Sequence, residues 1–252
     1  MSQQTQPLSV IERAVLRRVP TLGLRAGARV LDAPCGAGAL VTSLNQAGFD
    51  AWGIDLDDQA RPTLQERLLL SDLNRPLPWP DASFDALFSI EGIEHLENRF
   101  SFLREAHRIL RPEGTLLITT PNIVSLRSRV RFFGSGFFHR DSRPLNESRR
   151  HPLHHIGLST FADLRYGLHT SGFVLRNVSC THVKPVSYPY AIFVPWMYLY
   201  TLIAFRKEKD SAQRERNRDI RRMLFSPALL FGENLLLIAK KVDTAAATQR
   251  SA

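Results

Sequence analysis

The sequence predicts an α/β domain built on a mainly parallel β-sheet with helices on both faces. Short apolar runs, typical of buried strands, alternate along the chain with stretches whose apolar residues recur at helical spacing. In the first such unit an apolar run ends at Asp32, a turn with Gly36 and Gly38 follows, and a helical pattern begins near residue 39. A helix N-terminus behind a glycine-rich turn presents unpaired N–H groups, so we expect a small molecule to bind there.

The remaining elements are expected from the same periodicity, taken in chain order. Residues 9–19 form a predicted amphipathic helix, in which Ser9 and Glu12 have the spacing of a capping box. Gly48 ends the helix that follows the glycine-rich turn, and Pro62 excludes a long helix in the next segment. We expect strands at residues 28–33, 51–54, 67–71, 84–89, 115–120, 173–183 and 231–240, and further helices at residues 39–47, 101–110 and 161–168.

Length and cysteine content place the chain in a broad class. The 252 residues are enough for one α/β domain with an appendage. The two cysteines, Cys35 and Cys180, offer no disulfide framework, which is typical of proteins in a reducing cytosol. Residues 1–7 are mostly polar and lack the apolar core of a signal peptide. The sequence therefore predicts a cytoplasmic protein.

The net charge of +9 is concentrated in two segments. Residues 127–150 contain seven arginines and two acids, and residues 206–222 contain eight Lys or Arg and four acids, so the rest of the chain is neutral overall. Such basic segments bind phosphates of lipids, sugars or nucleic acids in some proteins and form an ordinary solvated face in others. The sequence is compatible with both interpretations.

The spacing of the glycine-rich turn helps to identify its ligand. A dinucleotide site has three glycines in a G-x-G-x-x-G pattern, whereas Val41 stands here where the third glycine would pack helix on strand. Two carboxylates, Asp32 before the turn and Asp55 at the end of the next predicted strand, flank the turn. Carboxylates suit a ribose diol or an ammonium group and would repel a pyrophosphate. These observations disfavour NAD.

The pattern Asp32-x-x-Cys35-Gly-x-Gly38, followed by Asp55, resembles the motif of class I S-adenosylmethionine-dependent methyltransferases. The resemblance covers residues 28–122 well and implies a Rossmann-like sheet of seven strands, mostly parallel, with the last strand antiparallel. It also implies that Asp55 binds the ribose hydroxyls and that Asp72 accepts the adenine amino group. The implied cofactor-binding residues are Asp32, Ala33, Cys35, Gly36, Gly38, Asp55, Leu56, Asp72, Leu73, Ser89, Ile90 and Glu91.

A cluster of reactive residues follows the fourth predicted strand. Glu91, Glu94 and His95 can share one side of a helical turn. They resemble the E-x-x-E-H element of ubiquinone-pathway O-methyltransferases and small-RNA 2′-O-methyltransferases, where it helps to hold a divalent metal, although in many relatives it only orders a loop. A metal is therefore an alternative that the sequence does not favour, and further histidines that could complete its ligands are His151, His154 and His155.

The catalytic candidates are histidines. An imidazole with a pKa near neutrality can take a proton from a hydroxyl as that oxygen attacks a methyl group. His154 and His155 lie between the first basic segment and a predicted helix, where relatives carry a histidine that faces the methyl group. We expect His155, or otherwise His154, on the substrate side of the pocket, with His95 as a third candidate.

Residues 185–229 form a predicted helical insertion before the last strand. Residues 188–205 are uncharged and hold four of the five tyrosines, and we expect Pro189 and Pro195 to break this run into pieces too short to cross a membrane. We expect the insertion to cover the acceptor side of the cleft, with an interfacial or substrate-covering helix. Residues 1–184 and 230–242 would form a single methyltransferase domain, and residues 243–252 a flexible tail.

These observations together predict an S-adenosylmethionine-dependent methyltransferase that O-methylates a hydrophobic, lipid- or sugar-linked small molecule. The alternatives are an RNA 2′-O-methyltransferase, suggested by the basic segments, and a non-catalytic cofactor-binding subunit. An amine acceptor is a less favoured variant. Other expected partners are an anionic membrane surface and a second copy of the chain, with nucleic acid less favoured.

Overall fold

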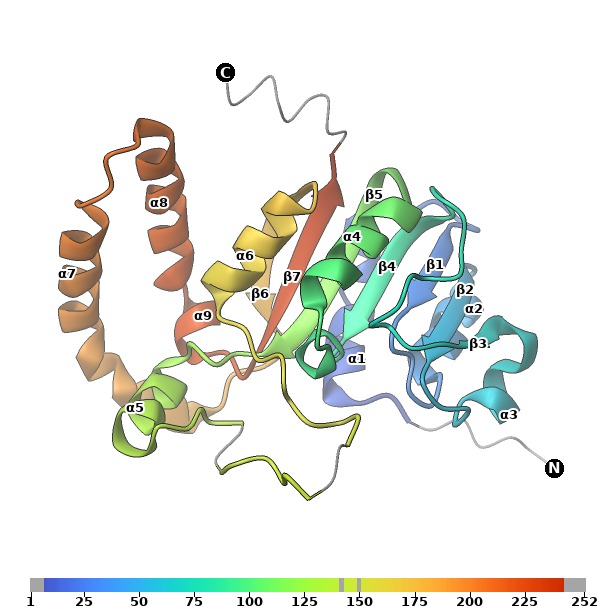
Figure 1. Cartoon of the computed structure of the whole chain (residues 1–252), viewed down its shortest axis with the longest axis horizontal. Helices are drawn as coiled ribbons and strands as arrows, with labels where there is room; N and C mark the ends of the chain where they lie inside the picture. Colours follow the sequence, from blue (N-terminus) through green and yellow to red (C-terminus); the bar gives the residue numbers. More distant parts are fainter. Residues whose placement is uncertain (1–6, 141–142, 149–150, 243–252) are drawn as a thin grey trace.

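The computed structural model describes residues 7–140, 143–148 and 151–242. The fold is built on one seven-stranded sheet with the strand order β3-β2-β1-β4-β5-β7-β6 (Figure 1). The pairs from β3 to β5 are parallel, and β7 is antiparallel to both β5 and β6. This confirms the predicted sheet. The strands are β1 (Arg29–Asp32), β2 (Asp50–Asp55), β3 (Leu68–Leu70), β4 (Phe84–Ile90), β5 (Leu110–Pro121), β6 (Phe173–Cys180) and β7 (Asn234–Lys241).

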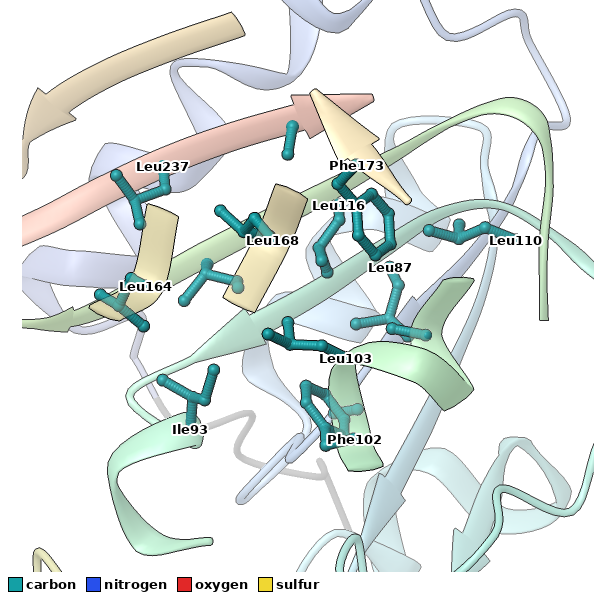
Figure 2. Packing of buried hydrophobic residues seen from close by; sticks show 14 of the residues in the cluster. Leu87, Ile93, Phe102, Leu103, Leu110, Leu116, Leu164, Leu168, Phe173 and Leu237 are labelled. Carbon is teal, nitrogen blue, oxygen red and sulfur yellow. The ribbon is translucent and has the colours of Figure 1, made fainter. Parts of the chain in front are cut away.

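Helices cover both faces of the sheet and give it two cores. On one face, α1 (Val10–Leu16), α2 (Ala39–Gln46) and α3 (Arg61–Leu64) pack on the strands, with the short 3-10 turns η1 (Val19–Leu22) and η2 (Gln65–Arg67). On the other face lie α4 (Arg99–Ile109) and α6 (Phe161–Thr170), whose leucines and phenylalanines fill the space above the strands in Figure 2. A sheet buried on both faces explains why its central strands are apolar runs without alternation.

Local signals in the sequence are found in the structure where expected. The Ser9 hydroxyl accepts a hydrogen bond from the N–H of Glu12, whose carboxylate in turn accepts from the N–H of Ser9. A second capping box, formed by Thr160 and Asp163, opens α6. The strand predicted at residues 115–120 is longer in the structure. As β5 it begins at Leu110, because Leu110 already pairs with Phe84 of β4.

The predicted insertion is helical. It contains the 3-10 helix η4 (Pro185–Phe193), then α7 (Val194–Phe205), α8 (Ser211–Leu224) and α9 (Pro227–Phe231). In Figure 1, α7 and α8 form a hairpin beyond the β6 edge of the sheet, and α5 (Leu126–Ser135) lies below them near the start of η4.

The expectation that prolines break this apolar run is wrong. Pro189 lies within η4, and Pro195 lies in the first turn of α7. A proline in the first turn of a helix costs little, because its missing N–H would have no partner within the helix. η4 therefore passes directly into α7. The predicted flexible tail, residues 243–252, lies outside the described residues.

Candidate functional site

The glycine-rich turn joins β1 to α2 and is held by the end of β2. The N–H of Cys35 donates to the carbonyl of Ile54 at 3.0 Å, and the N–H of Gly36 donates to the Asp55 carboxylate at 2.8 Å. Gly38 caps α2 with φ near +80°, and a Cβ there would lie 2.8 Å from the side chain of Leu64. Only glycine therefore fits this turn without a shift of its surroundings.

Asp32 is a buried carboxylate beneath the turn. It is 3% exposed, and its Oδ1 atom makes no hydrogen bond within the described residues. Burial raises the pKa of Asp32 well above its ordinary value, and the nearby Glu12 and Asp55 carboxylates raise it further. A buried polar atom without a partner is costly unless a ligand supplies the missing group. A ribose hydroxyl and an ammonium, the two groups that the sequence analysis associates with these carboxylates, are both able to donate to this oxygen.

A cavity of about 660 Å³ opens beside the turn, at the carboxyl ends of the first four strands. Asp55, the last residue of β2, and Leu56 after it form one wall. Asp72 and Leu73, which follow β3, form a second wall. Ligands of open α/β sheets bind outside the carboxyl ends of the strands, and this volume is ordinary for a drug-sized ligand.

The segment at residues 151–156 covers this cavity. Its lining residues include His154, whose backbone carbonyl lies 3.2 Å from Nδ1 of His95. One residue beyond the segment, the N–H of Gly157 donates to the carbonyl of Glu94 at 2.7 Å. The covering segment is therefore attached to the turn that follows β4.

Glu91 is held at the end of β4 by groups that are distant in sequence. Its carboxylate accepts from the Thr119 hydroxyl at 3.1 Å and from the Asn234 amide at 2.5 Å. Arg140 donates to the Asn234 carbonyl oxygen at 2.9 Å. Burial raises the pKa of Glu91, while these hydrogen bonds oppose that rise. Glu91 therefore connects β4, β5 and β7.

Glu94 is fully buried in the 3-10 turn η3 (Ile93–His95). The Thr120 hydroxyl donates to its Oε2 atom at 3.0 Å, and its Oε1 atom makes no hydrogen bond within the described residues. Burial, followed by repulsion from Glu91, raises the pKa of Glu94 to about 8. Glu94 therefore carries a proton near neutral pH.

The expected grouping of Glu91, Glu94 and His95 needs a correction. The group that could hold a metal ion consists of Glu94, His95 and His155, whose ligand atoms lie within 4.8 Å of one another. Glu91 is directed to Asn234 instead, because it precedes η3 with a positive φ and does not share its turn. One carboxylate and two imidazoles suit a divalent cation. The proton on Glu94 competes with such a cation near neutral pH.

The structure separates the residues predicted from the sequence into two sets. Lining the cavity are Asp55, Leu56, Asp72, Leu73, His95, His151 and His154. The other predicted residues do not line the cavity. They lie at the end of β1 and in the glycine-rich turn (Asp32, Ala33, Cys35, Gly36 and Gly38), at the end of β4 (Ser89, Ile90 and Glu91) and after residue 154 (His155). The ring of His155 lies 4.9 Å from the ring of His95.

Several lining residues were not predicted from the sequence, among them Asn74, Pro34 and Gly92. Asn74 accepts hydrogen bonds from the N–H groups of Glu97 and Asn98, and so joins the turn after β3 to that after β4. Pro34 and Gly92 lie against each other across the cavity floor, where a Cβ on Gly92 would lie 2.1 Å from Pro34 Cδ. The glycine directly after Glu91 was the available signal for this close approach.

Three of the five arginines of the first basic segment that the structure describes are engaged within the protein. Arg127 pairs with the buried Glu233 at 3.4 Å, and Arg129 donates to the carbonyl of Val124 at 2.6 Å. Arg140 binds Asn234, as described above. These arginines hold α5 and the following segment on the sheet, which weakens the interpretation that residues 127–150 bind nucleic acid.

The insertion does not line the cavity. Each lining residue belongs to the segments after β1, β2, β3 and β4 or to residues 151–156. Residues 185–229 therefore do not cover this cavity, and the expectation that they cover the acceptor side of the cleft stays a prediction. The physical reason is that η4 follows β6, which forms one edge of the sheet, while the cavity lies at the carboxyl ends of β1 to β4, in the other half of the strand order.

Known proteins resemble this chain in sequence. Residues 31–118 match the methyltransferase domain family. A probable S-adenosylmethionine-dependent methyltransferase of Mycolicibacterium smegmatis is 34% identical over 156 residues, which are 60% of this chain and 54% of that protein. A ubiquinone biosynthesis O-methyltransferase of Methylococcus capsulatus is 31% identical over 106 residues, which are 38% of this chain and 45% of that protein. The chain spans about half the length of the curated relatives it matches.

A solved structure shows the same fold. The crystal structure of an S-adenosylmethionine-dependent methyltransferase from Archaeoglobus fulgidus superimposes with a TM-score of 0.56. The match covers 92% of this chain and 93% of that one at 20% identity. At 20% identity this similarity shows the fold alone, so the reaction has to be inferred from the site.

Proposed function

We propose that this chain, which belongs to the class I S-adenosylmethionine-dependent methyltransferase family, methylates an oxygen of a hydrophobic, lipid- or sugar-linked small molecule. The observation that carries the proposal is the cavity with Asp55 and Asp72 on its walls, directly beside the glycine-rich turn. A relative named as an O-methyltransferase supports oxygen as the acceptor atom. We also propose that the protein works in the cytoplasm.

The residues present fit the cofactor. Asp55 lines the cavity with a carboxylate suited to ribose hydroxyls, and Asp72 offers another to an amino group of the base. Leu73, Leu96 and Ile156 provide apolar lining for a flat ring. The unpartnered oxygen of Asp32 suits the ammonium of the methionine part. When bound, S-adenosylmethionine supplies a methyl group made electrophilic by the positive sulfur.

The chain's own contribution to the reaction is alignment and proton transfer. Alignment of the attacking oxygen with the methyl group accounts for much of the rate of such transfers. A hydroxyl must also lose its proton, and burial raises the pKa of Glu94, which makes this carboxyl a less favoured acceptor near neutral pH. We propose His155 as the acceptor of that proton, with His95 and Glu94 holding its position.

The acceptor can be found with a labelled methyl group. The purified protein is incubated with an extract of cells that lack it and with S-adenosylmethionine carrying a trideuterated methyl group. We expect at least one compound in the extract to gain that group, measured by untargeted mass spectrometry. If the label appears in RNA rather than in a small molecule, the RNA methyltransferase alternative replaces the proposal. If no label appears in any fraction while the cofactor binds, the non-catalytic alternative replaces it.

Asp55→Asn should weaken cofactor binding about tenfold, corresponding to roughly 1.5 kcal/mol for a charge-assisted hydrogen bond. The amide removes the charge and has a single acceptor oxygen, so it cannot accept from all three N–H groups that Asp55 now serves, those of Gly36, Leu56 and Asp57. Calorimetry with S-adenosylmethionine measures the affinity. The exposed neighbour Asp58→Asn is the matched control, because it removes the same charge three residues away. Equal affinity for both variants, or tighter binding of NAD, would contradict the cofactor assignment.

His155→Gln and His154→Gln should have different kinetic effects. His154 lines the cavity, so its variant should raise the KM for S-adenosylmethionine with little change in kcat. His155 lies against His95, so its variant should lower kcat roughly a hundredfold with little change in that KM. Steady-state assays with the identified acceptor make this comparison. Wild-type kcat in His155→Gln would exclude His155 as the base.

A further inference from the structure

The outward face of α7 is an apolar surface that no other described element covers. No residue of α7 is buried, and the aromatic pair Trp196 and Tyr200 lies within it, with ring centroids 6.2 Å apart. Monomeric proteins seldom leave a continuous apolar helix face in water without a partner for it. The outward residues, from the end of η4 through α7, are Ile192 (78% exposed), Trp196 (67%), Leu199 (58%), Tyr200 (66%) and Ile203 (53%).

The opposite face of α7 packs against other elements of the protein. This packing determines which way the apolar face points. The Tyr198 ring contacts the Phe225 ring at 4.9 Å, and the Arg221 guanidinium lies over Tyr198 at 5.8 Å. Arg129 of α5 donates to the sulfur of Met197 at 3.7 Å. These contacts fix the rotation of α7, so its apolar residues stay directed outward.

The length of the apolar run permits contact with a membrane in two ways. By length and composition alone, residues 185–205 could cross a membrane. The run has 21 residues, and its most apolar stretch has a mean hydropathy of 1.2 and is not buried. Crossing would require the contacts of Met197 and Tyr198 with the rest of the protein to break. Docking needs only the outward face, and it leaves those contacts intact. Tyrosine and tryptophan are also the residues enriched at the interface of a bilayer.

Basic residues flank this surface. Lys184, which precedes η4, is half exposed but pairs with Glu233 at 3.1 Å. The turn after α7 carries the exposed Arg206, Lys207 and Lys209. Residues 206–222 have a net charge of +4. A second copy of the chain would add a second basic turn to the assembly and would not offset the positive charge of the first. An anionic surface complements it.

We propose that η4 and α7 form a docking surface for anionic phospholipid bilayers, with the apolar face of α7 entering the headgroup region and the basic turn binding lipid phosphates. The surface lies beyond the β6 edge of the sheet, away from the cavity (Figure 1). The inference does not depend on methyl transfer. It can be tested with neither cofactor nor acceptor present, so its failure would leave the proposed function standing.

Flotation of the full chain with vesicles tests the apolar part. We expect the protein to float with phosphatidylcholine–phosphatidylglycerol vesicles at low salt, and brominated lipid to quench Trp196. The variant Ile192→Ser/Leu199→Ser/Ile203→Ser should bind at least tenfold more weakly, because it removes three exposed apolar side chains and keeps the fluorescent probe. The matched control is Val10→Ser on α1, an exposed apolar residue far from the insertion.

A charge variant tests the lipid class. Arg206→Gln/Lys207→Gln should lower the affinity for anionic vesicles about 25-fold, or roughly fivefold per charge. Arg17→Gln/Arg104→Gln changes the net charge equally on α1 and α4, and it should bind like the wild type. Salt at about 1 M should release the wild-type protein, since lipid charges are then screened.

Four results would overturn the proposal. The first is wild-type protein that stays in solution with anionic vesicles at low salt, and the second is equal binding to neutral vesicles. The third is wild-type protein that salt does not release, which would indicate a spanning helix. The fourth is a wild-type dimer in sedimentation velocity that the triple serine variant converts to a monomer, which would assign the surface to a second copy of the chain.

Discussion

Gly92→Ala is expected to weaken binding of S-adenosylmethionine roughly a hundredfold, or about 3 kcal/mol, which is the upper range for overpacking in a dense site. The added Cβ would lie 2.1 Å from Pro34 Cδ and 3.1 Å from the hydroxyl of the buried Ser89. Ser89 cannot move because it lies within β4. The Pro34 segment must therefore shift, and with it the turn that carries the cofactor-binding residues. Calorimetry measures the affinity and thermal unfolding measures the stability.

Gly134→Ala is the matched control for this change. Gly134 lies in α5, where a Cβ would meet nothing within 4 Å. Alanine is preferred over glycine in a helix, so this variant should keep its affinity and unfold at the same or a higher temperature. Unchanged affinity and Tm in Gly92→Ala would show that Pro34 and Gly92 do not lie as close as the structure has them.

Glu94→Gln is expected to make the free energy of unfolding less dependent on pH. The pKa of Glu94 is raised in the folded protein, from an ordinary 4.5 to about 8, because the carboxyl is buried. The protonated, buried carboxyl therefore contributes its full stabilisation to the free energy of unfolding below the ordinary pKa, and this stabilisation is lost as the pH rises through 8. The loss approaches about 1.4 kcal/mol per pH unit in this interval, a few kcal/mol in all. Glutamine stays neutral, and its oxygen can still accept from Thr120.

Urea unfolding of both proteins at pH 5, 6.5 and 8.5 makes this measurement. The wild type should lose stability relative to Glu94→Gln as the pH rises, whereas the exposed Glu66→Gln should run parallel to the wild type. The series is measured with a chelator and again with Mg²⁺, Mn²⁺ or Zn²⁺. A cation on Glu94, His95 and His155 would reverse the trend by stabilising the wild type at high pH. Parallel curves for all three proteins would show that Glu94 is ionised in the fold.

The two basic segments illustrate why charge in a sequence is ambiguous. Both segments are rich in arginine, yet Arg127 and Arg140 bind Glu233 and Asn234, which are about a hundred residues away in the chain. The turn after α7 keeps its basic residues exposed. Whether an arginine is engaged or free depends on partners brought by the fold, and no local pattern contains that information.

The sequence by itself determined the strands, the glycine-rich turn, the capping box and the positions of Asp32, Asp55 and Asp72. These features depend on short-range patterns: apolar periodicity, the conformational freedom of glycine and the rule that parallel strands end at one edge of the sheet. The wall residues Leu56 and Leu73 could be predicted with them, because each directly follows one of the carboxylates, Asp55 or Asp72, to which the resemblance assigns a role.

Only the tertiary structure decided how the remaining site residues are grouped. Glu91 meets Asn234 across 143 residues, His154 closes the cavity while His155 meets His95, and Gly92 packs on Pro34. The outward direction of the apolar face of α7 was decided in the same way, by the packing of Tyr198 on Phe225. Each of these contacts joins segments whose separation in space follows from strand order and helix packing. Neighbouring residues such as His154 and His155 therefore look alike in the sequence, although their surroundings in the structure differ.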